Sequence, residues 1–358
     1  MDKLGLNPNL ILVFSDRKLL QQSNIGQEIR QAFPEALLAG CSTAGEIGGA
    51  TVKENSASIS FIEFEKTKII YREQEIKDAA DSLSSGASLI DSMEKEGLQH
   101  VFVLSDGINI NGSQLVIGMR DKIGEHCEIT GGLAGDGPDF RETVLLNNEG
   151  KLINKAAIAI GFYGDNLEVG YGSRGGWNSF GIERHVTKST DNVLYELDGK
   201  PALALYKSFL GDQAENLPAS GLLFPLSMRF ESDKKPLVRT ILGIDEKEQS
   251  LTFAGDIPTG SYVRLMKANV DRLIDGAEEA AKVAKIEGNS LAILISCVGR
   301  RLVLKQLVEE EVESVQEVLG KDCLLTGFYS YGEIAPFTKG ANCELHNQTM
   351  TITTFRES

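Results

Sequence analysis

Three turns of small residues each end in a glycine and an acid. They are Gly40–Glu46, Gly131–Asp136 and Gly327–Glu333. Each turn follows an apolar run that is typical of a buried strand, so its carboxylate is expected at the carboxyl edge of a sheet, where open α/β sheets bind ligands. The acids Glu46, Asp136 and Glu333 therefore predict a pocket between related lobes. The alternative is that each acid caps the turn or helix that follows it.

The turns belong to a unit that recurs along the chain. Ser15 to Gly45 spans 30 residues, Ser105 to Gly135 spans 30, and Ser296 to Gly332 spans 36. The stretch 81–87 also matches 271–277, ahead of the second and third copies. This duplication predicts two lobes of related build, with the first copy as an additional half.

Hydrophobic patterning indicates which elements carry the turns. The runs 101–104 and 291–295 do not alternate, which favours strands buried on both faces. A helix is expected over 25–33, and the alternating stretches 57–64 and 349–355 predict antiparallel strands. The fold class we expect is α/β, with mixed parallel and antiparallel sheets built from duplicated βαβ-containing lobes and helices on the outer faces.

The middle of the chain has a different composition. The stretch 170–181 is rich in glycine and holds Trp177, the only tryptophan. We place a domain boundary there, which gives an N-terminal α/β domain over 1–170 and a C-terminal α/β domain over 171–358. Beyond it, Pro201 is predicted to open a helix, and 211–220 is predicted to be a loop.

Cys41 and Ser42 sit at a strand end, where a nucleophile would be placed. The four histidines, His100, His126, His185 and His346, carry no local signature that ties one of them to Cys41 or Ser42. A hydrolase that uses Cys41 or Ser42 therefore remains an alternative to a protein without enzymatic activity, which is the preferred expectation. The turns also lack the lysine of a phosphate-binding loop and the glycine pattern of a dinucleotide site.

Further residues are candidates for binding a small polar ligand. Arg174, Trp177 and Asn178 offer a guanidinium, an aromatic platform and an amide. The alternative for Trp177 is that it fills the seam between domains. Arg300 and Arg301 follow the third-copy strand, where a guanidinium suits a carboxylate, or else forms an intramolecular salt bridge between lobes. With the turn residues, the predicted ligand-binding set is Cys41, Ser42, Thr43, Glu46, Arg174, Trp177, Asn178, Arg300, Tyr331, Glu333 and His346.

No group of histidine, cysteine and acidic residues has the spacing of a metal site. His346 is read first as a structural histidine. If haem were bound, His346 would be the first choice of axial ligand, because one histidine in a pocket is sufficient. The cofactor therefore stays unknown, with haem possible.

Composition excludes some classes of partner. The net charge is −15 and the pI is near 4.9, which argues against nucleic acid and against anionic membrane surfaces. The five cysteines show no CxxC spacing and suit a reducing compartment. With neither a signal peptide nor a membrane-spanning run in the sequence, we expect a cytoplasmic protein.

Long stretches of the chain resemble the FIST domain, a bacterial sensory module in two parts. The similarity to its N-terminal part lies in 38–47 and 131–136, and that to its C-terminal part in 192–202, 255–258, 261–266, 327–334 and 344–349. The resemblance implies intracellular sensing of a small molecule, with amino acids as the proposed ligand class. Relatives are often fused to, or encoded beside, histidine kinases, cyclic-di-GMP enzymes or chemotaxis receptors, and some bind haem and report nitric oxide to a partner kinase.

Four hypotheses follow. The preferred one is a sensory protein that binds a small ligand between its two lobes, near 40–49, 327–334 and 170–181. Because the sequence ends at Ser358 with no output domain, we expect the signal to pass to a separate partner. The alternatives are a haem-dependent nitric-oxide sensor that regulates a histidine kinase, and the hydrolase described above. A plain interaction scaffold would be favoured by a closed seam with no cavity.

Overall fold

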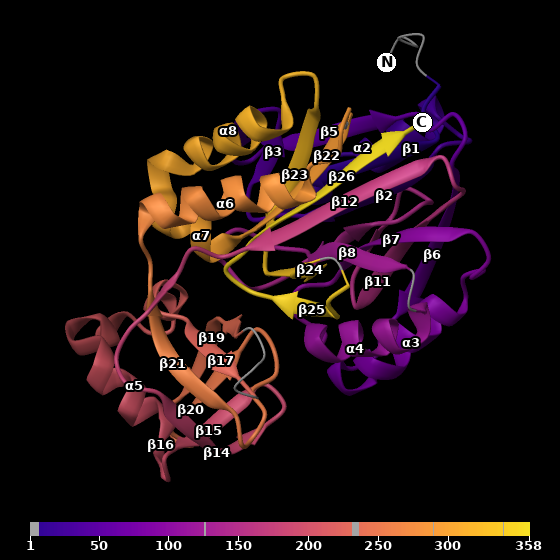
Figure 1. Cartoon of the computed structure of the whole chain (residues 1–358). Helices are drawn as coiled ribbons and strands as arrows, with labels where there is room; N and C mark the ends of the chain where they lie inside the picture. Colours follow the sequence, from indigo (N-terminus) through magenta and orange to yellow (C-terminus); the bar gives the residue numbers. More distant parts are fainter. Residues whose placement is uncertain (1–6, 125–126, 231–235, 289, 339) are drawn as a thin grey trace.

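The computed structural model describes residues 7–124, 127–230, 236–288, 290–338 and 340–358. Two parts can be followed in Figure 1. The insert, residues 178–267, lies apart at the lower left, and the other described residues form the body. The body contains all three copies of the repeated unit. As expected, it is mixed α/β.

Each copy builds a lobe of the same kind. Two strands pair in parallel around a crossover that contains helix, and a later antiparallel strand pairs on the outer side of the first strand. In the first lobe these elements are β1 (Leu10–Ser15), α1 (Arg17–Gln22), α2 (Ile25–Ala32), β2 (Leu37–Ser42) and β5 (Ala57–Ile62). In the second they are α3 (Ser82–Asp91), β7 (Leu98–Ser105), α4 (Gly112–Ile123), β8 (Glu128–Leu133) and β11 (Ala156–Tyr163). In the third they are α6 (Val270–Ala284), β22 (Leu291–Cys297), α7 (Val298–Leu304), α8 (Val308–Leu319), β23 (Leu324–Ser330) and β26 (Met350–Glu357).

The first copy is thus not an additional half. It forms a five-stranded sheet of its own, with the order β10-β9-β2-β1-β5. The second and third lobes each centre on a six-stranded sheet. The remaining strands of the body are β3 (Glu46–Gly48), β4 (Thr51–Lys53), β6 (Lys68–Glu75), β9 (Leu145–Leu146), β10 (Leu152–Ile153), β12 (Leu167–Arg174), β24 (Gly332–Pro336) and β25 (Cys343–His346).

The lobes exchange strands in a closed cycle. After the first-lobe turn, β3 pairs with β23 of the third lobe. After the third-lobe turn, β24 pairs with β8 of the second lobe. After the second-lobe turn, β9 pairs with β2 of the first lobe. Each acid-bearing turn is therefore the point where the chain passes from one lobe to the next, which brings the three turns together.

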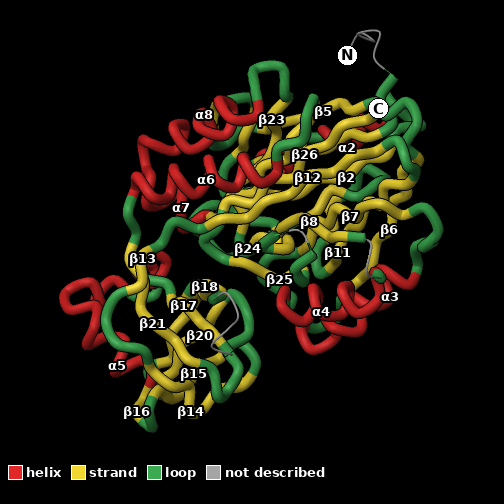
Figure 2. Tube along the Cα trace, viewed as in Figure 1, coloured by secondary structure: helices red, strands yellow, loops and turns green. Residues whose placement is uncertain are grey.

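The core explains why the first strand of each lobe is apolar on both faces. Leu10, Leu12 and Phe14 of β1 point into a central core shared with β7, β11, β22 and β26, whereas Ile11 and Val13 pack under α1 and α2. Figure 2 shows the strands gathered inside and the helices outside. Burying one such side chain stabilises the fold by roughly 1.5–3 kcal/mol. The predicted outer position of the helices is confirmed.

The insert has its own core and joins the body through polar contacts and a small apolar cluster around Trp177. Its nine-stranded sheet contains β13 (Asn178–Ser179), β14 (Arg184–Thr190), β15 (Val193–Leu197), β16 (Lys200–Pro201), β17 (Leu226–Arg229), β18 (Leu237–Arg239), β19 (Ile241–Asp245), β20 (Ser250–Phe253) and β21 (Tyr262–Lys267). Helix α5 (Ala202–Leu210) begins after Pro201, as predicted. At the contact with the body, Gln348 Nε2 donates to Leu222 O and Thr240 Oγ1, both at 3.1 Å, and Arg239 Nη1 donates to Leu345 O at 3.0 Å.

The stretch 211–220, predicted as a loop, is largely ordered as short helical turns. The 3-10 helices are η1 (Ala79–Asp81), η2 (Gly211–Asn216), η3 (Ala219–Leu223) and η4 (Lys305–Leu307). Local bonds hold η2 and η3 together, because Ser220 Oγ donates to Gln213 O at 2.8 Å. The division of the chain at residue 170 stays a prediction. Among the described residues, no helix combines the length and apolar character needed to cross a bilayer.

Candidate functional site

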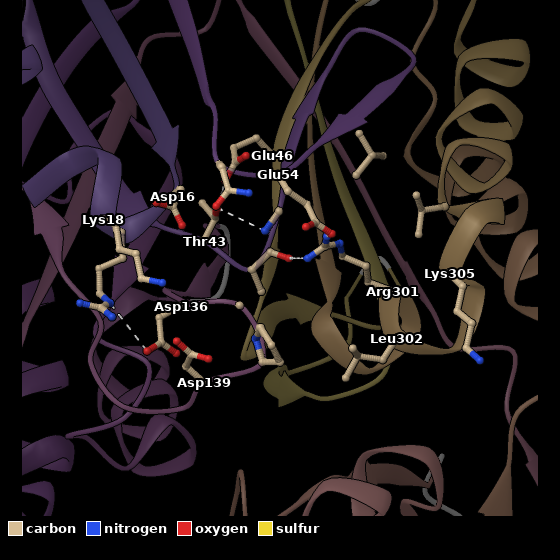
Figure 3. Close-up of a pocket in the computed structure, with 18 of the residues that line it drawn as sticks. Asp16, Lys18, Thr43, Glu46, Glu54, Asp136, Asp139, Arg301, Leu302 and Lys305 are labelled. Carbon is tan, nitrogen blue, oxygen red and sulfur yellow. Dashed lines mark hydrogen bonds and ion pairs between the residues drawn. The ribbon is translucent and has the colours of Figure 1, made fainter. Parts of the chain in front are cut away.

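A pocket of about 610 Å³ opens where the three lobes meet. We call it the inter-lobe pocket. Its walls come from Asp16–Lys18 and the turn 43–46 of the first lobe, from 136–139 of the second lobe, and from α7 and the residues after it in the third lobe. In Figure 3, Lys18, Asp136 and Asp139 lie on one side, and Arg301, Leu302 and Lys305 lie on the other. Two of the three predicted turn acids, Glu46 and Asp136, line it.

The first-lobe turn presents Glu46 in a fixed position. Thr43 Oγ1 donates to Glu46 Oε1 at 2.5 Å, and Ser56 donates to Glu46 Oε2 from its hydroxyl at 2.7 Å and from its backbone N–H at 3.3 Å. Burial raises the pKa of Glu46, although these hydrogen bonds oppose the shift. Gly45 has φ +134°, and a Cβ there would lie 3.0 Å from Arg301 Nε, so this turn needs glycine.

The second-lobe turn supplies a carboxylate with a cation beside it. Asp136 Oδ2 accepts hydrogen bonds from the backbone N–H groups of Arg141 and Glu142, both at 3.0 Å. Tyr331 donates its hydroxyl to the other oxygen. Arg17 Nε lies 3.7 Å from Asp136 Oδ2, and Arg17 Nη1 also bonds Glu142 at 2.9 Å. Asp136 is therefore largely satisfied by its own surroundings.

The third-lobe wall is basic. Arg301 extends from α7, donates to Ala44 O and pairs with Glu54 at the pocket mouth. Burial lowers the pKa of Arg301 from its ordinary value. Lys305 has φ +53°, a conformation that costs a non-glycine residue about 1–3 kcal/mol and that clusters at ligand sites.

Three charged side chains of the pocket have no partner in the structure. Among the described residues, Lys18, Lys305 and Asp139 form no ion pair and no side-chain hydrogen bond. The pocket therefore holds cations and an anion whose charges are free to meet a ligand. Of the residues that the structure describes, no histidine, cysteine, methionine or tyrosine lines this pocket.

The third-lobe turn repeats the geometry of the first but is sealed. Ser330 Oγ donates to Glu333 Oε1 at 2.7 Å, and Thr349 donates to Glu333 Oε2 from its N–H at 3.1 Å and from its hydroxyl at 2.9 Å. Glu333 is fully buried and does not line the inter-lobe pocket. Burial raises the pKa of Glu333 to about 8. Of the three turn acids, Glu333 is the one that the structure separates from the other two.

The possible nucleophiles lie inside the first lobe. Cys41 points into the central core, and burial raises its pKa well above the ordinary value. Ser42 Oγ accepts a hydrogen bond from Val144 N at 3.0 Å. Of the described histidines, none is hydrogen-bonded to either side chain: His100 bonds Thr130, His185 lies against Tyr262, and His346 bonds Ala335. His126 lies outside the described residues.

Arg300 and Tyr331 are buried and do not line the inter-lobe pocket. Arg300 Nε donates to Glu311 at 2.8 Å, and both side chains are completely buried, so Arg300 forms a salt bridge within the third lobe and not between lobes. Arg301 instead pairs with Glu54 of the first lobe, so its ion pair joins two lobes. Tyr331 stacks on Phe140 with ring centroids 4.2 Å apart, and its hydroxyl reaches Asp136. Tyr331 thus contacts a wall residue of the pocket without lining it.

The predicted seam residues lie between the insert and the third lobe, away from the inter-lobe pocket. Arg174 donates to Phe337 O at 2.9 Å, and Asn178 accepts from Arg272. Trp177 Nε1 donates to Gln348 O at 3.1 Å, and its ring packs with Met266, Leu273 and Leu304. Trp177 therefore fills the seam, as the alternative interpretation expected.

His346 was the candidate haem ligand. Its Nε2 lies 2.7 Å from Ala335 O, its ring packs on Phe337, and its Nδ1 is buried without a partner. Burial lowers the pKa of His346 to about 4, so the ring is neutral. His346 does not line the inter-lobe pocket, and that lining offers none of the usual axial ligands. The described residues of the pocket do not fit haem.

Several pocket residues were not in the predicted set. They are Arg17, Lys18, Asp139, Arg301 and Lys305. A positional signal existed for the first two, because Arg17 and Lys18 follow the end of β1 at the same carboxyl edge as the turns. Arg301 is adjacent to the predicted residue Arg300, but the sequence alone does not tell which of the two arginines lines the pocket and which is buried in the core.

Comparison with known proteins identifies the class. The model of the FIST N domain matches residues 9–200, and that of the FIST C domain matches residues 202–336. The chain therefore belongs to the FIST family, whose domains are sensory domains that bind small ligands.

Two individual proteins are similar to this chain. Uncharacterized protein MJ1623 of Methanocaldococcus jannaschii is 26% identical over an alignment of 348 residues, which covers 85% of this chain and 65% of that protein. The chain thus spans a little under two thirds of the length of this relative. The crystal structure of cyanuric acid hydrolase from A. caulinodans aligns with 98% of this chain and 90% of its own, at 6% identity and a TM-score of 0.36. Nothing about this chain follows from so low a score.

Proposed function

We propose that this protein senses a free amino acid, which binds in the inter-lobe pocket and signals to a separate partner protein. The observation that carries the proposal is the mixture of free charges in one pocket. Lys18, Lys305 and Asp139 have no ion-pair partner among the described residues, and Glu46 and Arg301 stand between them. A ligand with both an ammonium and a carboxylate group suits such walls.

The two ligand charges have natural places. The basic wall, with Arg301 and Lys305, suits the carboxylate, because a guanidinium binds it through two parallel hydrogen bonds. Asp139 and Glu46 suit the ammonium group. The volume of about 610 Å³ is within the usual range for small-molecule sites and leaves space for a side chain.

Helix α7 offers a route from the ligand to the insert. Arg301 is on this helix, and so is Gly299. Gly299 packs so closely on Gln348 that a Cβ added to it would lie 2.3 Å from Gln348 Nε2. Gln348 in turn bonds Leu222 and Thr240 of the insert. A ligand that prefers one position of α7 would shift the population of insert orientations by its difference in affinity for the two states. The receiving partner would be a signalling protein such as a histidine kinase or a cyclic-di-GMP enzyme.

Thermal unfolding with each of the twenty amino acids tests the proposal. We expect at least one to raise the melting temperature, and its analogues that lack the amine or the carboxylate to have no effect. Arg301→Leu and Asp139→Asn should abolish the shift. Arg356→Leu, which removes a half-buried arginine that does not line the pocket, should keep the shift. No shift with any amino acid, or an equal shift in Arg301→Leu, would exclude an amino-acid sensor.

A further inference from the structure

One residue of the body, Gln348, holds the insert through both its side chain and its backbone. Its side chain donates to Leu222 O and Thr240 Oγ1 of the insert, both at 3.1 Å. Its backbone oxygen accepts from Trp177 Nε1 at 3.1 Å, and Trp177 directly precedes the insert. Gln348 has φ +65°, in the left-handed region, and its Oε1 is buried with no hydrogen-bond partner among the described residues. Backbone conformations of this kind cluster at switch regions.

The other side of the same peptide group is bonded to Glu333. The N–H of the Gln348–Thr349 peptide donates to Glu333 Oε2 at 3.1 Å, and its C=O is the oxygen that accepts from Trp177. One planar peptide group therefore connects the sealed acid to the start of the insert. In Figure 1, β24, which carries Glu333, and β25 lie on the side of the body that faces the insert.

Glu333 can hold a proton and keep all its hydrogen bonds. Ser330 Oγ lies 2.7 Å from Glu333 Oε1 and 3.3 Å from Ser296 O. A hydroxyl has a single proton, so Ser330 cannot donate to both oxygens at once. With a proton on Oε1, Glu333 donates to Ser330 and Ser330 donates to Ser296 O, so both contacts are satisfied. Without that proton, Ser330 donates to Glu333, and Ser296 O loses this donor.

Loss of the proton also changes the bond to the peptide. A charge-assisted hydrogen bond between N–H and a carboxylate is about 2.7–2.9 Å long. The bond from Thr349 N to Glu333, at 3.1 Å, has the length of a neutral one. A charged Glu333 would therefore draw the Gln348–Thr349 peptide toward itself and away from Trp177. Gly299 leaves Gln348 little room to absorb this movement, because the two residues are closely packed.

Two ionisable side chains that face Glu333 are neutral near pH 8. His346 of β25 lies opposite Glu333 in register, and burial lowers the pKa of His346 to about 4. Burial raises the pKa of the Cys297 thiol on β22, and the charge of Glu333 raises it further. Burial also raises the pKa of Glu333 itself to about 8, against the hydrogen bonds from Ser330 and Thr349.

The charged side chains around β24 and β25 are already engaged. Arg300 of α7 favours the charged form of Glu333, but its guanidinium bonds Glu311. The others bond main-chain oxygens or an outer ion-pair partner, and they are Arg174 of β12, Arg239 of β18 and Glu344 of β25. The neighbouring strands β8 and β26 place Gly132 and Met350 at this end. Glu333 is therefore the group of this set that exchanges a proton near pH 8.

We infer that Glu333 is a proton-operated switch that sets how the insert is held against the body. With its proton, Glu333 leaves the Gln348–Thr349 peptide bonded to Trp177, as in the structure. Without it, the carboxylate draws that peptide away from Trp177 and loosens the hold of Gln348 on the insert. The inference goes beyond the proposed function, because it needs no amino acid, and each measurement that tests it is made without one.

Trp177, the only tryptophan, reports on this peptide directly. The fluorescence emission maximum of the full-length protein should shift in one transition with a midpoint near pH 8 when the pH is raised from 6 to 9. Glu333→Gln has the shape of the protonated acid and should lose the transition. Glu128→Gln is the matched control and should keep it, because burial also raises the pKa of Glu128, which bonds Tyr171 and not Gln348.

Movement of the insert is measured as the distance between two spin labels. The five cysteines are all buried, so the labels attach to Lys200→Cys of the insert and Glu313→Cys of α8, which are at the surface. The distance distribution should differ between pH 6.5 and pH 9, and should no longer differ once Glu333→Gln is added. Gln348→Met keeps the peptide and removes the side-chain bonds to the insert, so it should keep the emission transition and lose the change in distance.

The switch is overturned if the emission of Trp177 does not change over this pH range, or if Glu333→Gln shows the same transition as the wild type. It is also overturned if the emission changes while the label distances stay the same, because the proton would then act only locally. A change in distance that persists in Gln348→Met would contradict the route through this side chain. These results leave the amino-acid proposal untouched, since that proposal fails on the thermal shifts instead.

Discussion

The first-lobe and third-lobe turns have the same local structure and different surroundings. In both, the acid accepts a hydrogen bond from the hydroxyl three residues before it, and two more from the N–H and hydroxyl of a residue just before the antiparallel strand. Glu46 faces a pocket, and Glu333 is sealed. The repeated motif therefore builds a scaffold for a carboxylate, and what covers the turn decides whether a ligand can reach it.

The residue two positions before each acid explains why one turn is open and the other is sealed. Ala44 in the first turn and Tyr331 in the third stand at the same position, two residues before the acid. The Tyr331 ring packs closely on Gly107, since a Cβ added to Gly107 would lie only 3.1 Å from the ring. Leu345 covers Gly332. A tyrosine at one turn and an alanine at the other thus close one hollow and leave the other open.

Replacing the two adjacent arginines should give the largest contrast. Arg300→Met leaves Glu311 buried without its partner, so we expect the free energy of unfolding to fall by about 3–5 kcal/mol. Arg301→Met breaks a contact with the exposed Glu54, one backbone bond and the contact of the guanidinium with the Tyr329 ring, and should lower the free energy of unfolding by about 1 kcal/mol or less. Urea unfolding of both variants measures the difference. Equal losses would mean that the pocket wall is as much a part of the core as the sealed pair.

Glu333 should make stability depend on pH. Its folded pKa of about 8 is above its ordinary value of 4.5, so the native state binds the extra proton between these values and stability falls as pH rises through them. Between pH 5.5 and 8, the contribution of Glu333 to the free energy of unfolding of the wild type should fall by roughly 3 kcal/mol. Glu333→Gln, which imitates the protonated acid, should lose this dependence and be the more stable protein at pH 8.

The matched variant is Glu46→Gln. The pKa of Glu46 is also raised by burial, and three equivalent hydrogen bonds oppose the shift, but this side chain borders an open pocket. Its effect on the pH dependence of the melting temperature should have the same sign and be smaller. A larger effect for Glu46→Gln would reverse the comparison between the two turns.

The hydroxyl partners of the acids give a smaller contrast. Thr349→Val removes a hydrogen-bond donor to the buried Glu333 and should lower the free energy of unfolding by about 1–2 kcal/mol. Ser56→Ala removes the corresponding donor in the first turn, where water from the pocket can replace it, and should cost about 0.5 kcal/mol. Thermal unfolding at pH 7 compares them. If Ser56→Ala is the more damaging change, the first turn is not accessible to water.

The ion pair at the mouth should have the smallest effect on stability. Glu54→Gln removes an exposed partner of Arg301, so the free energy of unfolding should change by less than about 0.5 kcal/mol. Ligand affinity should rise, because Arg301 is then released for the ligand carboxylate. Weaker ligand binding in Glu54→Gln would instead place Glu54 among the groups that hold the ligand.

The sequence predicted the scaffold better than the site. Spacing and hydrophobic runs were sufficient for the βαβ units, because a strand buried on both faces needs an unbroken apolar run, as in β7 and β22. The cyclic exchange through β3, β9 and β24 was not predictable, because pairing between distant short strands leaves no local periodicity.

The site was only partly predicted for a related reason. Glu46 and Glu333 look alike along the chain, and only the packing of Tyr331 and Leu345 separates them. Asp139 and Lys305 resemble ordinary solvated charges in the sequence. They become site candidates only when distant segments are brought to one pocket.

Isothermal titration of Glu46→Gln and Glu333→Gln with the amino acid that most stabilises the wild type tests the central claim most directly. The account predicts that Glu46→Gln binds at least tenfold more weakly, a loss of about 1.4 kcal/mol, and that Glu333→Gln binds like the wild type. Unchanged affinity in Glu46→Gln together with lost affinity in Glu333→Gln would contradict it.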